Sequence, residues 1–425
     1  MIREAAALPR AAGTGGSVVV DRCQVCGSRG LEPVIFIGYL PPVNTMPLIG
    51  TQPREQPAYP AQVLRCTRCG LVQLGLIVDP AILFPPSYPY LSGTTRILRE
   101  NFAELYRESA PLLGLRPEDL VVDIGSNDGT LLRNFKDAGH RVRGIEPTQA
   151  GALANERGIP TDISFFDRAA ADRVVSREGR ARIITATNVF AHIEGVHDVV
   201  DAIVALLADD GAFISESHYW LSLVETLQYD TIYHEHLRHY TVGSLRYLLE
   251  MHGLEVFHAR RIPTHGGSIR VYAARTGTRR VNASVAQMLG EESRGLTDEG
   301  LRRFRSGVVT SKLGLHALLK DMKARGERVY GIGAPSRAST LINHVGLDAG
   351  IIDRVLEVEG SHKIGKYVPG TLIPVVHERA LFEDQPEHAL LLSWHIAEEL
   401  MPKLKAAGYR GDFIIPLPTP RVVSS

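Results

Sequence analysis

One stretch of the 425-residue chain, from Leu120 to Pro147, constrains the fold more than any other. A run of β-branched and aliphatic residues ends in a turn that contains Gly125 and Gly129, and a run with helical spacing follows it. A second short apolar run then ends on Glu146. The order strand, glycine turn, helix, strand is typical of a doubly wound α/β sheet, in which ligands bind at the carboxyl ends of the strands.

The residues of this turn also indicate which ligand it binds. An acid about 20 residues after such a turn can hold ribose hydroxyl groups, and Glu146 has that spacing. Asn127 and Asp128 stand where a dinucleotide turn has its second glycine, which disfavours a pyrophosphate at the helix N-terminus. S-adenosylmethionine (SAM) has a ribose, a positive charge and no phosphate, and acids at 123 and 128 would lie near its cationic end. An ordinary βαβ turn without a ligand is the alternative. The predicted cofactor-binding residues are Asp123, Gly125, Ser126, Asn127, Asp128, Gly129, Glu146, Pro147 and Asn188.

All four cysteines of the chain lie near its N-terminus, in two C-x-x-C pairs. Thiolates with this spacing in a tight turn can share one tetrahedral metal ion, so the pattern predicts a structural zinc site. Disulfides are the alternative, and a cytosolic chain disfavours them. The loop between the pairs has no basic run, which argues against nucleic-acid binding. The predicted zinc ligands are Cys23, Cys26, Cys66 and Cys69.

Strand and helix patterns alternate along the remaining chain. Apolar runs at 182–190 and 211–217 are separated by a helical pattern, which predicts a mostly parallel sheet with helices on both faces. Residues 96–113 and 281–325 have the pattern of long helical segments, and the last hundred residues begin a second α/β pattern. The predicted class is α/β, with an N-terminal zinc-ribbon-like domain, a central Rossmann-like SAM-binding domain and a C-terminal Rossmann-like domain. The predicted boundaries are 18–80, 81–255 and 256–425.

The segment 229–240 carries an unusual density of titratable side chains. The zinc-protease motif H-E-x-x-H would need a histidine at position 238, where the chain has Arg238. Imidazole titrates near neutral pH, so the segment favours a general acid or base. A different metal geometry that uses His234, His236 and His239 is one alternative, and a group of solvated surface histidines is another.

Two later segments carry candidates for substrate binding. Adjacent glycines before a strand, at 266–267, indicate close approach of the backbone to a ligand, and Arg270 suits an anionic group. The turn at 333–335 can cradle phosphate through backbone N–H groups. A loop around Gly365 could reach a phosphorylated ligand. The predicted substrate-binding residues are His265, Gly266, Gly267, Ser268, Arg270, Arg337, Lys363, Lys366 and Tyr367.

The charge balance and the apolar runs exclude several classes of protein. The formal net charge is zero, so nothing attracts the chain to nucleic acid or to an acidic membrane surface. No apolar run reaches the roughly 18 residues that span a bilayer. Residues 1–17 lack the apolar core of a signal peptide. We therefore expect a cytoplasmic protein without nucleic-acid or membrane partners.

Taken together, these motifs resemble the SAM-dependent C-methyltransferases that act on nucleotide-linked 4-keto deoxysugars. The resemblance covers about residues 20–420 and rests on several motifs in one order. These motifs are the two C-x-x-C pairs, the Tyr88-Pro89-Tyr90 loop, the turn at 123–129, the segments 188–192, 233–236 and 265–268, and the turn at 333–335. The last turn departs from the Lys-Gly-Asn run that is common in the family.

The resemblance implies a role for each matching position. Glu146 would hold the ribose of SAM, and His236 would be the base that removes the C3 proton of the sugar. The C-terminal domain would help to hold the nucleotide sugar, and the zinc domain would close over the site. The implied catalytic residues are His236, Glu235, Tyr233, His192 and one tyrosine of the pair Tyr88 and Tyr90.

The implied chemistry is enolisation followed by methyl transfer. A ketone at C4 acidifies the neighbouring C3–H bond, a base removes that proton, and the resulting enolate takes the methyl group at C3. An O- or N-methyltransferase acting on a small molecule is one alternative, because it needs no enolising base. A zinc-ribbon protein that only senses SAM is another.

Overall fold

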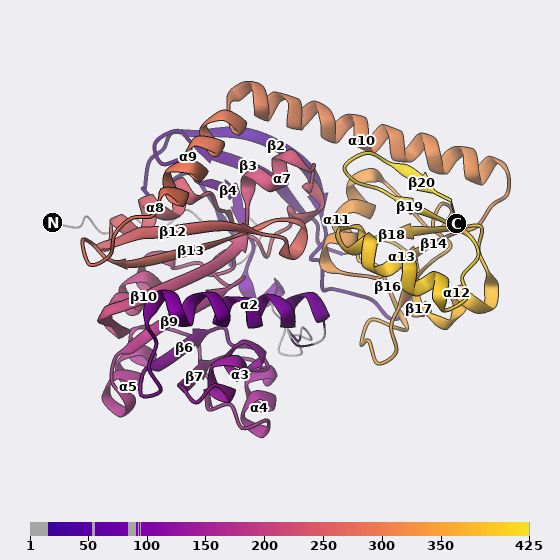
Figure 1. Cartoon of the computed structure of the whole chain (residues 1–425). Helices are drawn as coiled ribbons and strands as arrows, with labels where there is room; N and C mark the ends of the chain where they lie inside the picture. The colour runs from indigo at the N-terminus through magenta and orange to yellow at the C-terminus, as the bar shows by residue number, and fades with distance from the viewer. Residues whose placement is uncertain (1–15, 53–55, 84–90, 92, 94, 425) are drawn as a thin grey trace.

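The structure is a computed structural model that describes residues 16–52, 56–83, 91, 93 and 95–424. Its strands form three larger sheets and one two-stranded sheet, which pairs β1 (Val18–Val19) with β5 (Leu76–Ile77). The C-terminal sheet lies to one side of the other two, and helix α10 (Asp298–Ala324) spans both parts (Figure 1). Among the described residues, no helix combines the length and the apolar character that crossing a membrane requires.

The N-terminal sheet holds the cysteine pairs and includes one strand from much later in the chain. It is antiparallel, in the order β11-β4-β3-β2. Its strands are β2 (Leu31–Leu40), β3 (Tyr59–Cys66), β4 (Val72–Leu74) and β11 (Arg238–His239), and the short helix α1 (Pro80–Leu83) follows β5. Because β11 comes directly after the segment that contains His236, this pairing attaches the N-terminal domain to the candidate catalytic segment.

The central sheet has seven strands in the order β12-β13-β10-β9-β6-β7-β8, parallel from β8 to β10 and antiparallel at β13 and β12. Helices on its two faces confirm the predicted Rossmann-like arrangement (Figure 1). The strands are β6 (Leu120–Ile124), β7 (Arg141–Ile145), β8 (Thr161–Asp162), β9 (Ala181–Thr187), β10 (Leu207–His218), β12 (Leu254–Ile262) and β13 (Ser268–Arg275). The helices are α2 (Arg96–Leu113), α3 (Thr130–Asp137), α4 (Gln149–Glu156), α5 (Arg168–Glu178), α6 (Val196–Leu206), α7 (Trp220–Glu225), α8 (Val242–Glu250) and α9 (Ala283–Gly295).

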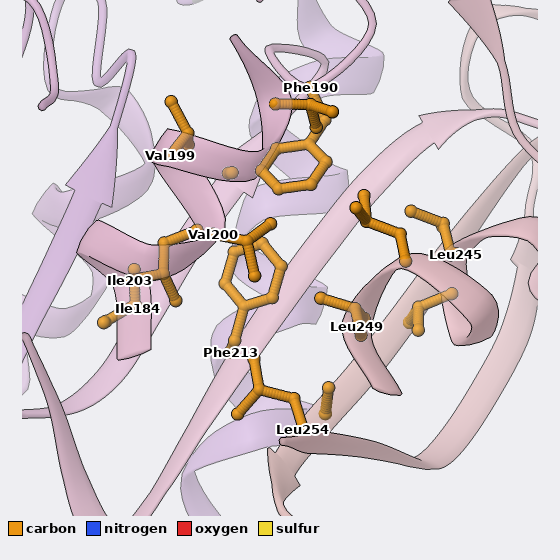
Figure 2. Packing of buried hydrophobic residues seen from close by; sticks show 14 of the residues in the cluster. Ile184, Phe190, Val199, Val200, Ile203, Phe213, Leu245, Leu249 and Leu254 are labelled. Atoms are coloured by element: carbon orange, nitrogen blue, oxygen red, sulfur yellow. The ribbon is translucent and has the colours of Figure 1, made fainter. Parts of the chain in front are cut away.

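The core of this domain follows from the apolar runs of its sequence. Every residue of β6 is buried, as expected of a parallel strand covered on both faces. Phe190 and Phe213 pack together at a ring-centroid distance of 5.4 Å (Figure 2). Val200 of α6 and Leu249 of α8 extend the same cluster. Burying side chains of this size contributes about 1.5–3 kcal/mol each.

The C-terminal sheet also has seven strands, in the order β16-β17-β15-β14-β18-β19-β20. The four strands from β17 to β18 and the neighbouring β19 are parallel, which confirms a second Rossmann-like unit. The strands are β14 (Val329–Ile332), β15 (Arg354–Glu357), β16 (Lys366–Tyr367), β17 (Pro374–His377), β18 (His388–Leu391), β19 (Asp412–Ile415) and β20 (Arg421–Val423). The helices are α11 (Ser336–Val345), α12 (Arg379–Asp384) and α13 (Ala397–Ala406).

Helix α10 ties the domains together through one apolar stripe. Its buried residues recur every three or four positions, among them Leu301, Phe304 and Leu315, which places them on one face. The same apolar cluster contains residues of β2, α7 and the C-terminal sheet. Strands β12 and β13, within residues 254–275, belong to the central sheet. That sheet therefore continues beyond residue 255, the predicted end of the central domain.

Candidate functional site

The predicted cofactor turn lies at the carboxyl edge of the central sheet, between β6 and α3. Gly125 and Gly129 have φ values of 67° and 76°, in the left-handed region that favours glycine. Glu146 follows β7 directly and closes the turn: Oε2 accepts the backbone N–H of Asn127 at 3.1 Å, and Oε1 accepts that of Thr148 at 2.9 Å. A carboxylate offers about four lone-pair sites, so both oxygens keep capacity for ribose hydroxyl groups.

The two acids expected near the cationic end of SAM have different surroundings. Asp123 is buried and accepts a hydrogen bond from Thr185 Oγ1 at 2.6 Å, and burial raises its pKa to about 7. Asp128 accepts from Thr130 Oγ1 at 2.7 Å and forms an ion pair with Arg157 at 3.0 Å. Asp128 therefore already has a cationic partner within the protein.

The other predicted cofactor residues surround the same edge. Ser126 is buried in the turn, and Pro147 follows Glu146 half-buried. Asn188 follows β9 with a φ of 57°, and its backbone N–H donates to the carbonyl of Glu216 at 2.8 Å. The strand ends thus bring residues from three parts of the chain together, as the α/β pattern predicts.

His236 is the centre of a group of aromatic rings next to this edge. Its ring centroid lies 4.2 Å from that of Tyr233, 5.0 Å from that of His192 and 4.9 Å from that of His218. The ring of His265 lies 5.2 Å from that of His218. The structure therefore gathers the predicted Tyr233, His192 and His265 around His236, from segments that are far apart in the sequence. Tyr88 and Tyr90 lie outside the described residues.

One hydrogen bond fixes the tautomer of His236. Its Nδ1 lies 2.8 Å from the backbone carbonyl oxygen of Thr231. A carbonyl can only accept, so Nδ1 carries the hydrogen and the lone pair of the neutral ring is on Nε2. Burial and the neighbouring imidazoles of His192, His239 and His265 lower the pKa of His236 well below 6.5. Near neutral pH this ring is an uncharged proton acceptor.

The surrounding imidazoles are also neutral near pH 7. Burial lowers the pKa of His192 to about 4, and the positive charge of Arg238 contributes to that shift. Burial lowers the pKa of His239 and of His265 to about 4 as well, and that of His218 well below 6.5. His234, His236 and His239 are buried, which argues against the interpretation of 229–240 as solvated surface histidines.

Some residues at this site carried no clear sequence signal. His218 ends β10 and Asn44 lies in the N-terminal domain, where Nδ2 donates to Glu235 Oε1 at 2.6 Å. A lone histidine at a strand end and a lone asparagine in a loop have no motif. Their position depends on tertiary packing alone.

The residues around 265–268 form a tight loop between β12 and β13 of the central sheet. His265 has a φ of 56°, and Gly266 and Gly267 also have positive φ values. The carbonyl of Gly266 accepts from Gln228 Nε2, and the buried Ser268 Oγ donates to the carbonyl of Thr264 at 3.0 Å. The side chain of Gln228 lies against this backbone, and the predicted approach to a ligand stays a prediction.

The two arginines predicted to meet an anionic substrate have partners inside the protein. Arg270 is fully buried and donates from Nε to Glu216 at 2.6 Å and from Nη1 to Glu108. Arg337 donates to both oxygens of Asp230 at 2.8 Å, and its guanidinium carbon lies 4.9 Å from the ring centroid of Trp394. A guanidinium that has a buried carboxylate beside it does not need a ligand to neutralise its charge.

The loop near Gly365 makes contacts of its own. Lys363 is half-buried and donates from Nζ to the carbonyl of Ala334, and desolvation of its amino group lowers its pKa. Lys366 and Tyr367 form β16, where the Tyr367 N–H donates to the carbonyl of Pro47 at 2.7 Å. This strand joins the C-terminal sheet to the N-terminal segment.

The four cysteines converge as their spacing predicts. Their Sγ atoms all lie within 4.8 Å of one another, with Cys23 and Cys69 at 3.4 Å and Cys26 and Cys66 at 3.4 Å. Four thiolates around one tetrahedral zinc ion stand about 3.8 Å apart at a Zn–S distance of about 2.3 Å, so the cluster fits a zinc ion. Four protein ligands leave no open position for catalysis.

Three family models match successive parts of the chain. They are a putative zinc binding domain over residues 23–84, a methyltransferase domain over 95–259, and a C-methyltransferase C-terminal domain over 263–418. A curated relative, the C-methyltransferase NovU of Streptomyces niveus, is 34% identical over 413 residues, which cover 96% of this chain and 97% of NovU.

Two solved structures are each similar to part of the chain. The PH0226 protein of Pyrococcus horikoshii OT3 is 13% identical, with a TM-score of 0.35, over 47% of this chain and 97% of its own. Magnesium protoporphyrin IX methyltransferase of Synechocystis PCC 6803, solved with bound SAM, is 15% identical, with a TM-score of 0.33, over 43% of this chain and 83% of its own.

Proposed function

Because this chain belongs to the SAM-dependent C-methyltransferases, the family of NovU, we propose that it methylates C3 of a nucleotide-linked 4-keto-6-deoxy sugar through an enolate. The observation that carries this proposal is the neutral, buried His236, whose Nδ1 is committed to the Thr231 carbonyl. Transfer to an oxygen or nitrogen nucleophile needs no enolising base. A C–H bond next to a ketone does.

In this proposal, the edge of the central sheet binds SAM. Glu146 holds the ribose hydroxyl groups, and the turn from Asp123 to Gly129 surrounds the methionine part. Asn188 closes this edge from the end of β9. When bound, SAM supplies the electrophilic methyl group. Holding the two reactants in line is worth about 7–11 kcal/mol of the barrier.

Proton removal is assigned to Nε2 of His236. Nδ1 keeps its hydrogen bond to the Thr231 carbonyl, so the ring stays oriented before and after it takes the proton. General-base catalysis of this kind contributes about 10²–10⁴-fold. The neutral form that this step needs is the one that burial favours, because burial lowers the pKa of His236.

The enolate oxygen needs a hydrogen-bond donor, and Tyr233 and His192 are the assigned candidates because both rings contact His236. A well-placed donor of this kind contributes about 3–4 kcal/mol. Glu235 lines the site and is held by Asn44 of the N-terminal domain. That contact supports the proposal that the zinc domain closes over the reacting groups. The zinc ion itself would have a structural role.

The nucleotide part of the substrate is assigned to the C-terminal domain. Its turn at 333–335 leads into helix α11, which carries Arg337. The ion pair with Asp230 of the central domain holds Arg337 in place. We assign Arg337 to positioning of the domains and Arg270 to holding α2 on the central sheet, because their guanidinium groups have carboxylate partners there. Lys363, Lys366 and Tyr367 remain candidates for contact with the sugar nucleotide.

Mass spectrometry of reactions with SAM and a panel of 4-keto-6-deoxy nucleotide sugars tests the proposal. We expect one member of the panel to gain the mass of one methylene group and, without SAM, to exchange its C3 proton with D₂O. A protein that binds SAM but acts on no keto sugar in the panel would contradict the proposal and favour another acceptor.

A further inference from the structure

A cavity next to His236 is lined by polar side chains that have too few partners. Its lining residues are Asn188, Ala191, His192, Ser217, His218, His236, Arg238 and His239. Several of their buried polar atoms form no hydrogen bond, namely Asn188 Oδ1, Ser217 Oγ, His239 Nε2, and Nε and Nη2 of Arg238. Buried polar groups in proteins are almost always hydrogen-bonded to protein or to ordered water, so a group of unpartnered atoms around one cavity indicates that a polar partner occupies it.

Arg238 is the most unusual member of this group. It is 1% exposed, and its Nη1 donates to Gln24 Oε1 at 2.6 Å and to the carbonyl of Glu194 at 3.4 Å. Both acceptors are uncharged, and no described residue places a carboxylate within ion-pair distance of this guanidinium. A buried charge without a counter-charge is strongly unfavourable.

The other buried arginines of the molecule show what Arg238 lacks. Arg270 has Glu216 and Glu108 beside it, and Arg337 has Asp230. The groups near Arg238 cannot replace such a carboxylate. The imidazoles of the cavity are neutral near pH 7. The hydroxyl group of Tyr240 contacts the side chain of Arg238, and burial raises its pKa and keeps it uncharged. No described side chain therefore balances the charge of Arg238, and this favours an anionic group of a ligand beside it.

We propose that Arg238 is a further catalytic residue, which binds the enolate oxygen formed when His236 removes the substrate proton. This inference rests on the proposed function. The C3–H bond breaks and its proton moves to Nε2 of His236. The electron pair of that bond becomes the C3–C4 double bond, and the π pair of the carbonyl moves to the oxygen at C4. The unpartnered N–H groups of Arg238 then receive that oxyanion. The charge exists only in the enolate and in the transition state before it, so this contact accelerates enolisation.

The position of Arg238 suits this role. It stands two residues after His236, at the start of β11, and the pairing of β11 with β4 fixes its backbone. Gln24 lies between the zinc ligands Cys23 and Cys26, so the metal site holds the side chain that orients Nη1. The zinc domain would then act on the reaction by positioning Arg238.

Proton exchange at C3 in D₂O, followed by NMR without SAM, tests Arg238 separately from methyl transfer. We expect Arg238→Gln to lower the exchange rate by about 10²–10³-fold with little change in the KM for the sugar or the Kd for SAM. Arg238→Lys, which keeps the charge but not the forked geometry, should lose about tenfold. Guanidinium at millimolar concentration should restore part of the exchange of Arg238→Ala.

Arg275→Gln is the matched control. Its guanidinium also donates to backbone carbonyls, those of Val204 and Leu207, at the opposite edge of the sheet. If a folded Arg238→Gln variant exchanges the C3 proton at a rate within threefold of the wild type, the inference is overturned. A loss of exchange that neither the lysine substitution nor added guanidinium restores would also overturn it. If the glutamine variant does not fold, the lysine variant decides, and unchanged exchange in it overturns the inference. A wild type that exchanges no keto sugar would instead refute the proposed function.

Discussion

The central and C-terminal sheets contain the same local arrangement, and they use it differently. In each, a strand leads into a glycine turn and a helix, and the next strand brings a glutamate that accepts a backbone N–H of the turn. Glu146 accepts from Asn127 at 3.1 Å in the central sheet, and Glu357 accepts from Ala334 at 2.6 Å in the C-terminal sheet. The glycine that opens each turn has a left-handed φ, 67° at Gly125 and 78° at Gly333.

The difference lies in what surrounds the two turns. Two residues before Gly125 stands the buried acid Asp123, whereas the position before Gly333 that corresponds to it is Gly331. Around the C-terminal turn, Lys363 donates to the Ala334 carbonyl, and Arg337 is paired with Asp230 of the central domain. A strand–glycine–helix turn therefore predicts a fold but not a ligand. In the proposed function, the neighbouring charges distinguish the turn that binds SAM from the turn that joins two domains.

The largest effect is expected on turnover, when the proposed base His236 is removed from the central domain. His236→Ala should lower turnover by about 10³-fold or more, because the base is lost, and should leave the Kd for SAM unchanged. Steady-state kinetics and calorimetric SAM titration measure the two quantities. His140→Ala, far from the site on the Arg116 carbonyl, is the control. Turnover close to that of the wild type would remove His236 as the base.

The second prediction concerns the ion pair that joins the domains at the C-terminal turn. Arg337→Met should lower the free energy of unfolding by about 3–5 kcal/mol, because it leaves Asp230 as an unpaired buried charge. Adding Asp230→Asn should recover part of that loss. Chemical denaturation measures both. If the single variant is as stable as the wild type, Arg337 does not hold the domains, and its assignment returns to substrate binding.

The third prediction compares the two glutamates directly. Glu146→Gln should raise the Kd for SAM by about 10- to 100-fold, since hydrogen bonds to a charged group contribute about 1.5–3 kcal/mol. Glu357→Gln should leave that Kd unchanged, because its turn lies in the other domain. Equal effects of the two changes on SAM affinity would contradict the different use of the two turns.

The smallest effect is expected on the pH dependence of stability, through Asp123, whose counterpart in the C-terminal sheet is Gly331. Burial raises its pKa to about 7, whereas an unfolded chain has a pKa of about 3.9. Between these values the folded protein keeps a proton that the unfolded chain has released, so the free energy of unfolding falls as the pH rises from about 4 to 7. Asp123→Asn should remove that slope. Thermal unfolding at pH 5 and pH 8 measures this pH dependence. If the variant and the wild type have the same dependence, Asp123 is not the group that causes it.

Local patterns predicted the elements and the metal cluster well. Helix α2 has the bounds expected of the 96–113 segment, and the C-x-x-C spacing brought four Sγ atoms together. The segment 281–325 is two helices, because Thr297 accepts the N–H of Gly300 and begins a new helix. That capping residue is visible in the sequence, although the helical pattern runs through it.

The sequence predicted which residues gather at the site better than it predicted their partners. His192, Tyr233 and His236 lie together because strand ends and their loops share one edge of the sheet. Arg270 and Arg337 were predicted to bind an anion of the substrate, and the structure adds that each has a buried acid beside it. Asp230 is 107 residues from Arg337 along the chain, and residue type alone cannot reveal such a pair.

The central claim is that the methyl group reaches a carbon next to a ketone. The most direct measurement uses SAM with a ¹³C-labelled methyl group and carbon NMR of the sugar product. We expect the label to couple to a ring carbon adjacent to the C4 carbonyl. A label attached to oxygen or nitrogen would contradict the enolate mechanism and the assignment of His236 as its base.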